Sequence, residues 1–262
     1  EGRMIELDQV TQHYGIRPVL RRISLRVESG ELVALAGPNG MGKSTLLGVM
    51  AGTLSPQHGH VRILGLERKS SAEAELSIRR QSVYLPDRPW LPKNRTGREY
   101  LMAVGRLYSR PDDELMDHVD RLLGVFELWR EGDWPIRSYS QGQQKKISLS
   151  AALVTSTPIL LLDEPFSGGL DPSGILALKH ILKRLVQHER ATVVMTTPVP
   201  EILDELADRI AIVRDGEIVA FDTPAGLRRQ AQCSGGLDEV MARLIHPKTL
   251  ENLSRYFGES VP

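Results

Sequence analysis

The chain has 262 residues, of which 41% are hydrophobic and 25% are charged, and this composition is typical of a globular protein with a substantial core. Its 33 basic residues balance its 33 acidic residues, so no strongly basic field favours nucleic acid and we expect no nucleic-acid partner. The chain has no apolar run near the roughly 18 residues of a membrane span, no secretory signal pattern, and one cysteine, which fits a reducing cytosol.

The N-terminal segments predict a β layer. Residues 4–10 alternate loosely between apolar and polar and predict a strand, and residues 11–15 predict a turn. Residues 23–27 alternate in the same way, which is typical of a strand with one wet face. Residues 31–36 are mostly apolar and predict a buried strand. We therefore expect an antiparallel layer beside an α/β core.

The next stretch matches the phosphate-binding loop pattern G-x-x-x-x-G-K-[ST] at every fixed position, between the buried strand and a predicted helix over 44–51. Loop N–H groups and the helix N-terminus favour an anion. Lys43 would reach the outer phosphates, and the Ser44 hydroxyl would ligate Mg²⁺. The sequence thus predicts a nucleoside triphosphate site made by Gly37, Pro38, Asn39, Gly40, Met41, Gly42, Lys43, Ser44 and Thr45.

The middle of the chain predicts a helical lobe inserted into the core. Short strands over 59–65 and 82–85 lead to a proline-rich loop at 86–92. From Thr96 the apolar spacing becomes helical, with Gly124 expected as a C-cap. The tryptophans of the chain lie in or beside this segment, where they either fill the core of the lobe or form a docking surface. They are Trp90, Trp129 and Trp134.

The second half returns to alternating strands and helices. The predicted elements are a helix within 138–154, a buried strand over 158–165, a helix from Asp171-Pro172 to about 188, a strand over 192–196, a helix over 201–207, a hairpin around Asp215-Gly216 and a helix pair that ends near Leu244. We therefore expect an α/β fold. It combines a P-loop NTPase core with a mostly parallel sheet, an N-terminal antiparallel β layer and an inserted helical lobe.

Two carboxylates end the buried strand over 158–165. Asp163 would hold Mg²⁺ directly or through water. Glu164 would polarise the water that attacks the γ-phosphate, as the catalytic residue. The alternative is a strand that merely ends in two solvated acids, and the phosphate loop earlier in the chain argues against it.

Residues 139–143, Tyr-Ser-Gln-Gly-Gln, follow the helical insertion and resemble the signature motif of ATP-binding cassette (ABC) ATPases, usually Leu-Ser-Gly-Gly-Gln. The resemblance covers Met4 to about Leu244 and is to nucleotide-binding subunits of bacterial exporters with separate permeases. It implies a single ABC ATPase domain over 4–244 and a tail over 245–262. The core would comprise 4–86 and 156–222, and the helical lobe about 88–155.

The resemblance also implies a dimer that binds ATP and Mg²⁺ between its subunits. The signature of one subunit would face the γ-phosphate held by the other, so Ser140, Gln141, Gly142 and Gln143 join the nucleotide-binding candidates. Tyr14 fits the aromatic that stacks on adenine, or is an ordinary surface tyrosine.

Asp171 fits a dimer-contacting loop and also a helix N-cap. The implied partners are transmembrane permease subunits and a second ABC ATPase subunit, identical or different. The chain would lie in the cytoplasm, on the inner face of the cell membrane through the permease.

Three positions depart from the family pattern. Asp87 stands where the family usually presents glutamine to the metal and the attacking water, and we expect it to reach Mg²⁺. Gly168-Gly169 makes the following loop one residue longer than usual. Pro198 stands where a switch histidine is expected, and proline has no ring nitrogen to hold a phosphate or orient water. We therefore expect that ATP turnover is slowed or that one of the two sites in the dimer is degenerate.

These features predict the ATPase subunit of a membrane transporter, which would use MgATP hydrolysis to drive translocation through a separate permease. One alternative is a regulatory or degenerate subunit with little hydrolysis, which Pro198 motivates. A less favoured alternative is an ABC protein of translation or DNA repair that works outside transport. Its usual second cassette or long coiled-coil insertion is missing from this sequence.

Overall fold

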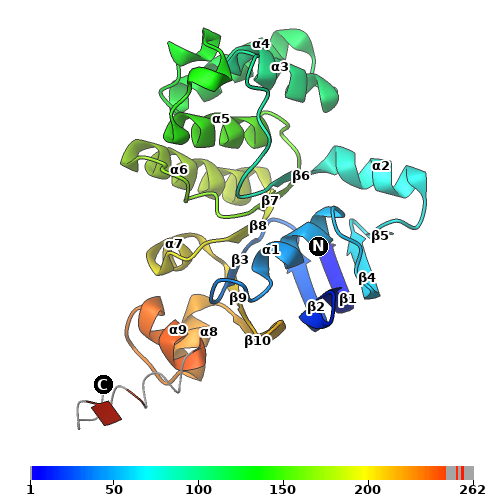
Figure 1. Ribbon diagram of the computed structural model, residues 1–262, viewed down its shortest axis with the longest axis vertical. Coiled ribbons are helices and arrows are strands. Elements are labelled where there is room, and N and C mark those ends of the chain that lie inside the picture. The colour runs from blue at the N-terminus through cyan, green and yellow to red at the C-terminus, as the bar shows by residue number, and fades with distance from the viewer. Residues whose placement is uncertain (1, 246–251, 253–254, 257–262) are drawn as a thin grey trace.

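The computed structural model describes residues 2–245, 252, 255 and 256. It has an α/β architecture with two sheets, a helical lobe at one end and a C-terminal helix pair at the other (Figure 1). This agrees with the predicted fold class. Within the part of the chain that the structure describes, no helix is both long and apolar enough to cross a bilayer. The predicted tail over 245–262 lies almost entirely outside the described residues.

A four-stranded antiparallel sheet confirms the predicted N-terminal β layer, in the order β2-β1-β4-β5. Its strands are β1 (Arg3–Tyr14), β2 (Arg17–Glu28), β4 (His58–Ile63) and β5 (Leu66–Glu67). The predicted turn over 11–15 is wrong because β1 continues to Tyr14, through bulges that keep its last residues paired with β2. The chain reverses at Gly15, whose φ of +61° suits a tight turn.

The second sheet has the order β10-β9-β3-β8-β7-β6 and is parallel except for its edge strand β10. Its strands are β3 (Leu32–Ala36), β6 (Ser82–Leu85), β7 (Ile159–Leu162), β8 (Thr192–Thr196), β9 (Arg209–Arg214) and β10 (Glu217–Asp222). Every residue of β3, β7 and β8 is buried, as expected for strands covered on both faces. Their carboxyl ends lie side by side, so the loops that follow them meet at one edge.

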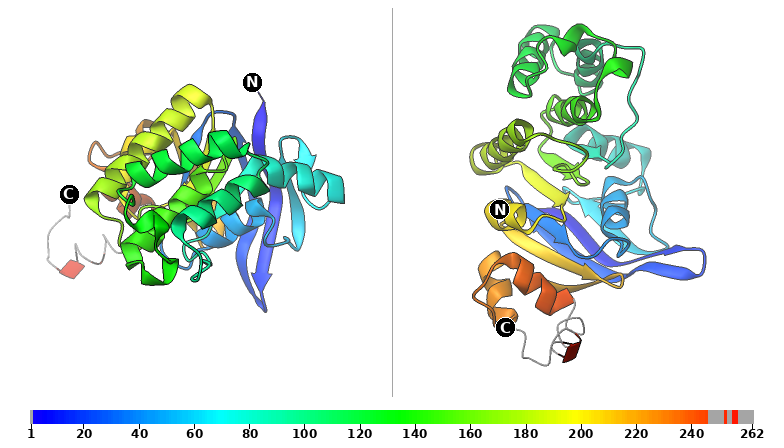
Figure 2. Two further views of the ribbon diagram at one scale, coloured as in Figure 1. Left: turned by 90° about the horizontal axis from the view of Figure 1, so that it is seen from above. Right: turned by 60° about the vertical axis from the view of Figure 1, so that its left-hand side comes forward.

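Two hydrophobic cores lie on opposite faces of the parallel sheet. Val33 and Leu35 of β3 face a core shared with the antiparallel sheet and α1, whereas Leu32 and Ala34 face a core shared with the lobe and the later helices. The helix α1 therefore lies between the two sheets, and α6 and α7 cover the other face (Figure 2). The helices of the core are α1 (Lys43–Ala51), α2 (Ala72–Gln81), α6 (Pro172–Glu189), α7 (Pro200–Leu206), α8 (Pro224–Gln230) and α9 (Leu237–Ile245).

The predicted helical lobe contains α3 (Gly97–Leu107), α4 (Asp112–Val125) and α5 (Gln141–Leu153), with short 3-10 helices at Glu131–Asp133 and Ile136–Ser138. Gly124 is not a C-cap, because α4 continues past it to Val125. A Cβ at Gly124 would lie 2.9 Å from the Trp129 ring, so this glycine lets the tryptophan pack closely. The tryptophans do not fill the lobe core, since they are 81%, 59% and 49% exposed in chain order.

Candidate functional site

The phosphate-loop pattern lies between β3 and α1, at the carboxyl edge of the parallel sheet. Gly37 has a φ of +142°, and a Cβ there would lie 2.1 Å from the Val213 carbonyl oxygen of β9. Gly42 has a φ of +99°, and its Cβ would lie 2.8 Å from the carbonyl oxygen of Val19 in β2. Both glycines are required because the loop passes between two strands too closely for a side chain.

The N-terminus of α1 lacks a protein cap. Its N-cap Gly42 has no side chain to cap the helix, and no acidic residue lies in the first turn. By contrast, α2, α3, α5, α6 and α8 have side-chain caps, and α4 and α7, which lack such caps, have acidic residues in their first turns. The first amides of α1, with the Ser44 side chain, therefore suit an external anion. Lys43 is buried in the same loop, where its Nζ donates to the carbonyl oxygens of Gly37 (2.7 Å) and Pro38 (2.8 Å).

Asp163 and Glu164 follow β7 and are held by one hydroxyl of the neighbouring strand β8. Thr196 Oγ1 donates to Asp163 Oδ1 at 2.6 Å and accepts from the Glu164 backbone N–H at 2.8 Å. Glu164 has a left-handed φ of +46°, which the Thr196 contact helps to fix. Burial lowers the pKa of Lys43, and the nearby Glu164 and Asp163 carboxylates oppose that shift. The structure thus brings the phosphate-loop lysine and the acidic pair together.

The residues present fit a magnesium ion that is shared with phosphate oxygens. Among the described residues, no group of three or more His, Cys, Asp or Glu side chains could hold a metal by itself. Mg²⁺ is usually bound by one or two carboxylates together with phosphates and water. Asp163 and the Ser44 hydroxyl meet that requirement, because both lie at the edge where the uncapped helix would hold a triphosphate.

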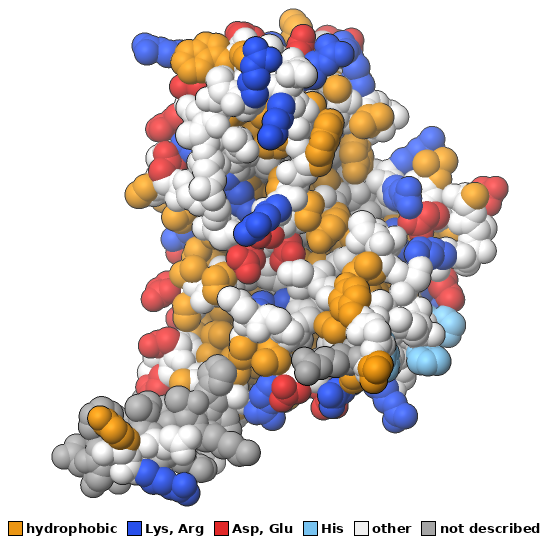
Figure 3. Space-filling model, viewed as in Figure 1, with side chains coloured by type: hydrophobic (Ala, Val, Ile, Leu, Met, Phe, Trp, Pro, Cys, Tyr) orange, Lys and Arg blue, Asp and Glu red, His pale blue; other side chains and the backbone are white. Residues whose placement is uncertain are grey.

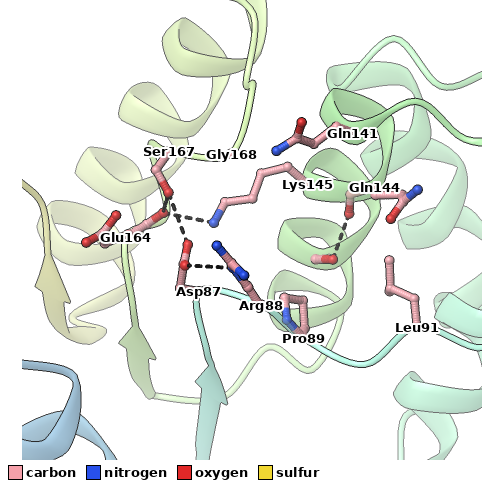
Figure 4. Close-up of a pocket in the computed structure, with 11 residues that line it drawn as sticks. Asp87, Arg88, Pro89, Leu91, Gln141, Gln144, Lys145, Glu164, Ser167 and Gly168 are labelled. Atoms are coloured by element: carbon pink, nitrogen blue, oxygen red, sulfur yellow. Dashed lines mark hydrogen bonds and ion pairs between the residues drawn. The ribbon is translucent and has the colours of Figure 1, made fainter.

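Asp87, in the loop after β6, lies near the Glu164 loop. The single hydroxyl hydrogen of Ser167 is shared between Asp87 Oδ1, 3.2 Å from Oγ, and the Glu164 carbonyl oxygen, 2.9 Å from Oγ. The three residues line a cavity of about 390 Å³ together with Gln141 and Lys145 of α5 (Figure 4). Asp87 is therefore linked through Ser167 to the backbone of the catalytic candidate.

The signature residues form the N-terminus of α5. Ser140 is the N-cap, and it exchanges two hydrogen bonds with Gln143 in a capping box. A Cβ at Gly142 would lie 2.7 Å from the carbonyl oxygen of Gly169, one of the paired glycines after the acidic pair. No interaction among the described residues joins 140–143 to the phosphate loop, which lies in the core below the lobe (Figure 1).

Asp171, Tyr14 and Pro198 are the remaining candidates. Asp171 is the N-cap of α6, and its carboxylate also accepts from Lys146 Nζ at 2.8 Å. Tyr14 lies at the end of β1 and is 54% exposed. Pro198 is exposed just after β8 and lines a cavity of about 400 Å³ with Gly37, Pro38 and Asn39.

Sequence reasoning assigned no function to Thr196, Ser167 or Lys145, although each contacts the acidic pair or its loop. Thr196 carried a weak signal, as a hydroxyl at the carboxyl end of a buried parallel strand. Lys145 follows the signature motif within one helical turn, but only the structure shows that its ammonium group points back to Glu164.

The family model described as ABC transporter matches residues 20–167, more than half of the chain. The chain belongs to the ABC transporter family. It is 33% identical to the Daunorubicin resistance ATP-binding protein DrrA3 of Streptomyces coeruleorubidus over 91% of this chain and 73% of that protein. It is also 33% identical to the Nod factor export ATP-binding protein I of Sinorhizobium fredii, over 85% of this chain and 64% of that protein's length.

Two solved structures support the same assignment. An ATP-binding subunit of an ABC transporter has a TM-score of 0.84 and 30% identity, and it covers 92% of this chain and 99% of its own. A dimeric ATP-binding cassette in a post-hydrolysis state, bound to ADP and Pi, has a TM-score of 0.76 and 26% identity over 84% of this chain and 98% of its own. The chain is therefore an ABC ATPase, the ATP-binding subunit of a transporter.

Proposed function

We propose that this ABC ATPase hydrolyses MgATP at the interface of a dimer and so drives translocation through separate permease subunits. The observation that carries the proposal is the convergence of three features at one sheet edge. The uncapped helix α1, the buried Lys43 ammonium group and the acidic pair Asp163-Glu164 lie together there. An anion-binding helix end beside a carboxylate for the metal and a carboxylate for water suits phosphoryl transfer.

Each of these side chains has a defined task in the proposed reaction. Lys43 exchanges its two carbonyl partners for phosphate oxygens, and Ser44 and Asp163 hold Mg²⁺. When bound, Mg²⁺ would supply positive charge that offsets the negative charge of the phosphate groups. Glu164 would accept a hydrogen bond from the attacking water, and Asp87, which shares the Ser167 hydroxyl with the Glu164 loop, would reach the metal or that water.

A second subunit completes the site. Among the described residues, no interaction joins Ser140, Gln141 or Gly142 at the N-terminus of α5 to the phosphate loop of the same chain, and a helix N-terminus favours an anion. The dimeric post-hydrolysis cassette supports the inference that this end meets nucleotide bound by the other subunit. Tyr14 would stack on the adenine, and Asp171 would lie at the contact between subunits.

The helical lobe offers a surface for the permease. Trp90 and Leu107 are about four-fifths exposed and border a cavity of about 600 Å³ that Tyr100, Met102 and Val104 also line. Hydrophobic side chains are also visible on this lobe in the space-filling view (Figure 3). Exposed aromatic side chains beside a hollow often anchor a protein partner. Docking there would hold the chain on the cytoplasmic face of the membrane, and the relative named for Nod factor export favours an exporter.

The test is phosphate release from MgATP at increasing concentrations of the purified chain. A rate that rises faster than linearly, and is lost in Glu164→Gln, supports a shared site. Glu164→Gln keeps the size of the side chain and its backbone contacts, so it should still bind ATP. Linear or absent turnover in the presence of the permease would contradict hydrolysis at a dimer interface.

Pro198 favours a second candidate function, a regulatory subunit that binds ATP but hydrolyses it slowly. It lies beside the phosphate loop and offers no ring nitrogen to a phosphate. Pro198→His should then raise turnover with little change in ATP affinity, measured by phosphate release and equilibrium binding. Equal turnover of the two proteins would remove the case for a regulatory subunit.

A further inference from the structure

Lys145 of α5 is a buried cation that the proposed reaction does not use. Only 5% of it is exposed, and its Nζ donates to the backbone carbonyl oxygen of Glu164 at 2.8 Å (Figure 4). Lysine is almost never buried to this extent without a compensating partner. Its position in the cavity beside Glu164 therefore calls for a functional explanation.

The surroundings of Lys145 are strongly acidic. The carboxylates of Asp87, Glu164 and Asp163 all act on its ammonium group, although burial dominates and lowers the pKa of Lys145. Lys43 faces Glu164 and Asp163 as well, and it belongs to the phosphate loop. One lysine from the core and another from the helical lobe therefore lie near the acidic pair.

The bond from Lys145 is not needed to satisfy the Glu164 carbonyl group. That oxygen also accepts from the backbone N–H of Ser167 at 3.1 Å and from Ser167 Oγ at 2.9 Å, within the same turn. The turn is closed by these two local bonds. Lys145 adds a connection between the turn and a separate helix, so it links α5 to the loop.

We propose that Lys145 is a positioning residue that ties the signature helix α5 to the loop of Glu164. It lies five residues after the N-cap Ser140, which is about one and a half helical turns. A displacement of the signature end of α5 is therefore transmitted to the catalytic carboxylate of the same subunit. The part of the proposal that concerns catalysis rests on the proposed function, whereas the restraint on the loop does not.

The test compares Lys145→Met, Lys145→Arg and Lys183→Met. Methionine keeps the length of the buried chain without its charge, and the local Ser167 bonds keep the turn closed. Arginine restores a donor, for which the adjoining cavity of about 390 Å³ leaves space. Lys183 is the matched control, because it pairs with Glu205 on α7 and Lys179 also pairs with that glutamate.

Two readouts separate this proposal from the proposed function. In Lys145→Met, we expect kcat for phosphate release to fall by about 10- to 100-fold with ATP affinity unchanged, because a small misplacement of a catalytic group has effects of this size. Lys145→Arg should recover most of the rate, and Lys183→Met should match the wild type. Unchanged kcat in Lys145→Met would overturn the positioning role.

Hydrogen exchange of the Ser167 amide provides the readout that needs no hydrolysis. It should be faster in Lys145→Met than in the wild type or Lys183→Met, since the turn has lost its link to α5. If the wild type releases no phosphate, the proposed hydrolysis fails and exchange alone decides. Unchanged exchange would then overturn the restraint on the loop.

Discussion

Replacing Thr196 with valine removes the hydroxyl that holds both members of the acidic pair while preserving the shape of the side chain. Thr196 is fully buried, so neither Asp163 Oδ1 nor the Glu164 N–H regains a water partner easily at that position. A hydrogen bond to a charged group contributes about 1.5–3 kcal/mol, and one between neutral groups about 0.5–1.5 kcal/mol. We expect Thr196→Val to lower the free energy of unfolding by roughly 2–4 kcal/mol.

The matched control is Thr196→Ser, which keeps the hydroxyl and loses one buried methyl group, at a cost of about 1 kcal/mol. The valine variant should therefore unfold at a lower temperature than the serine variant. For a chain of this size, the melting temperature changes by about 2–4 °C for each kcal/mol of stability, so the melting temperatures of the valine and serine variants should differ by roughly 5 °C. Thermal unfolding of the two purified variants measures it. A valine variant as stable as the serine variant would refute the argument that the hydroxyl fixes the pair.

Two further substitutions test the loop and the helix cap. Gly37→Ala should abolish ATP binding or folding, because its Cβ would lie 2.1 Å from the Val213 carbonyl oxygen. Calorimetry measures ATP binding and circular dichroism measures folding, so together they show which of the two is lost. Normal ATP affinity would contradict the close approach. The hydrogen bond from Lys146 is the main cause that lowers the pKa of Asp171, so its stabilising effect is present above the ordinary value of 3.8 and is lost as pH falls through the lower folded-state pKa. The wild type should therefore unfold at a higher denaturant concentration than Asp171→Asn near pH 7, and the two proteins should unfold at the same concentration in strong acid. A difference between their unfolding midpoints that persists in strong acid would contradict the ionic cause.

The parallel strands and the phosphate loop could be predicted because their signals are local. Residues 159–162 are apolar without interruption, and this alone indicates a strand buried on both faces. The end of β1 could not be predicted in the same way, since bulges break its alternation while the backbone remains paired with β2. Gly124 was misassigned because a glycine required by close packing looks the same in sequence as one that ends a helix.

The same limit applies within the candidate site. Lys43, Asp163 and Glu164 belong to motifs whose spacing along the chain reports their chemistry. Thr196 acts through hydrogen bonds with residues 33 and 32 positions earlier, and Lys145 through one hydrogen bond to a residue 19 positions later. No periodicity encodes such pairs, because they depend on which strands are neighbours and on how far a side chain reaches.

The two hydrogen bonds from Lys43 to the carbonyl oxygens of Gly37 and Pro38 bear on how a ligand is received. They keep the phosphate loop folded around its own ammonium group, so the arriving nucleotide meets a preformed cradle. Under the proposed function, binding would exchange partners at Lys43 and would order little of the backbone, which would reduce the entropic cost of association. Product departure would follow the same exchange in reverse.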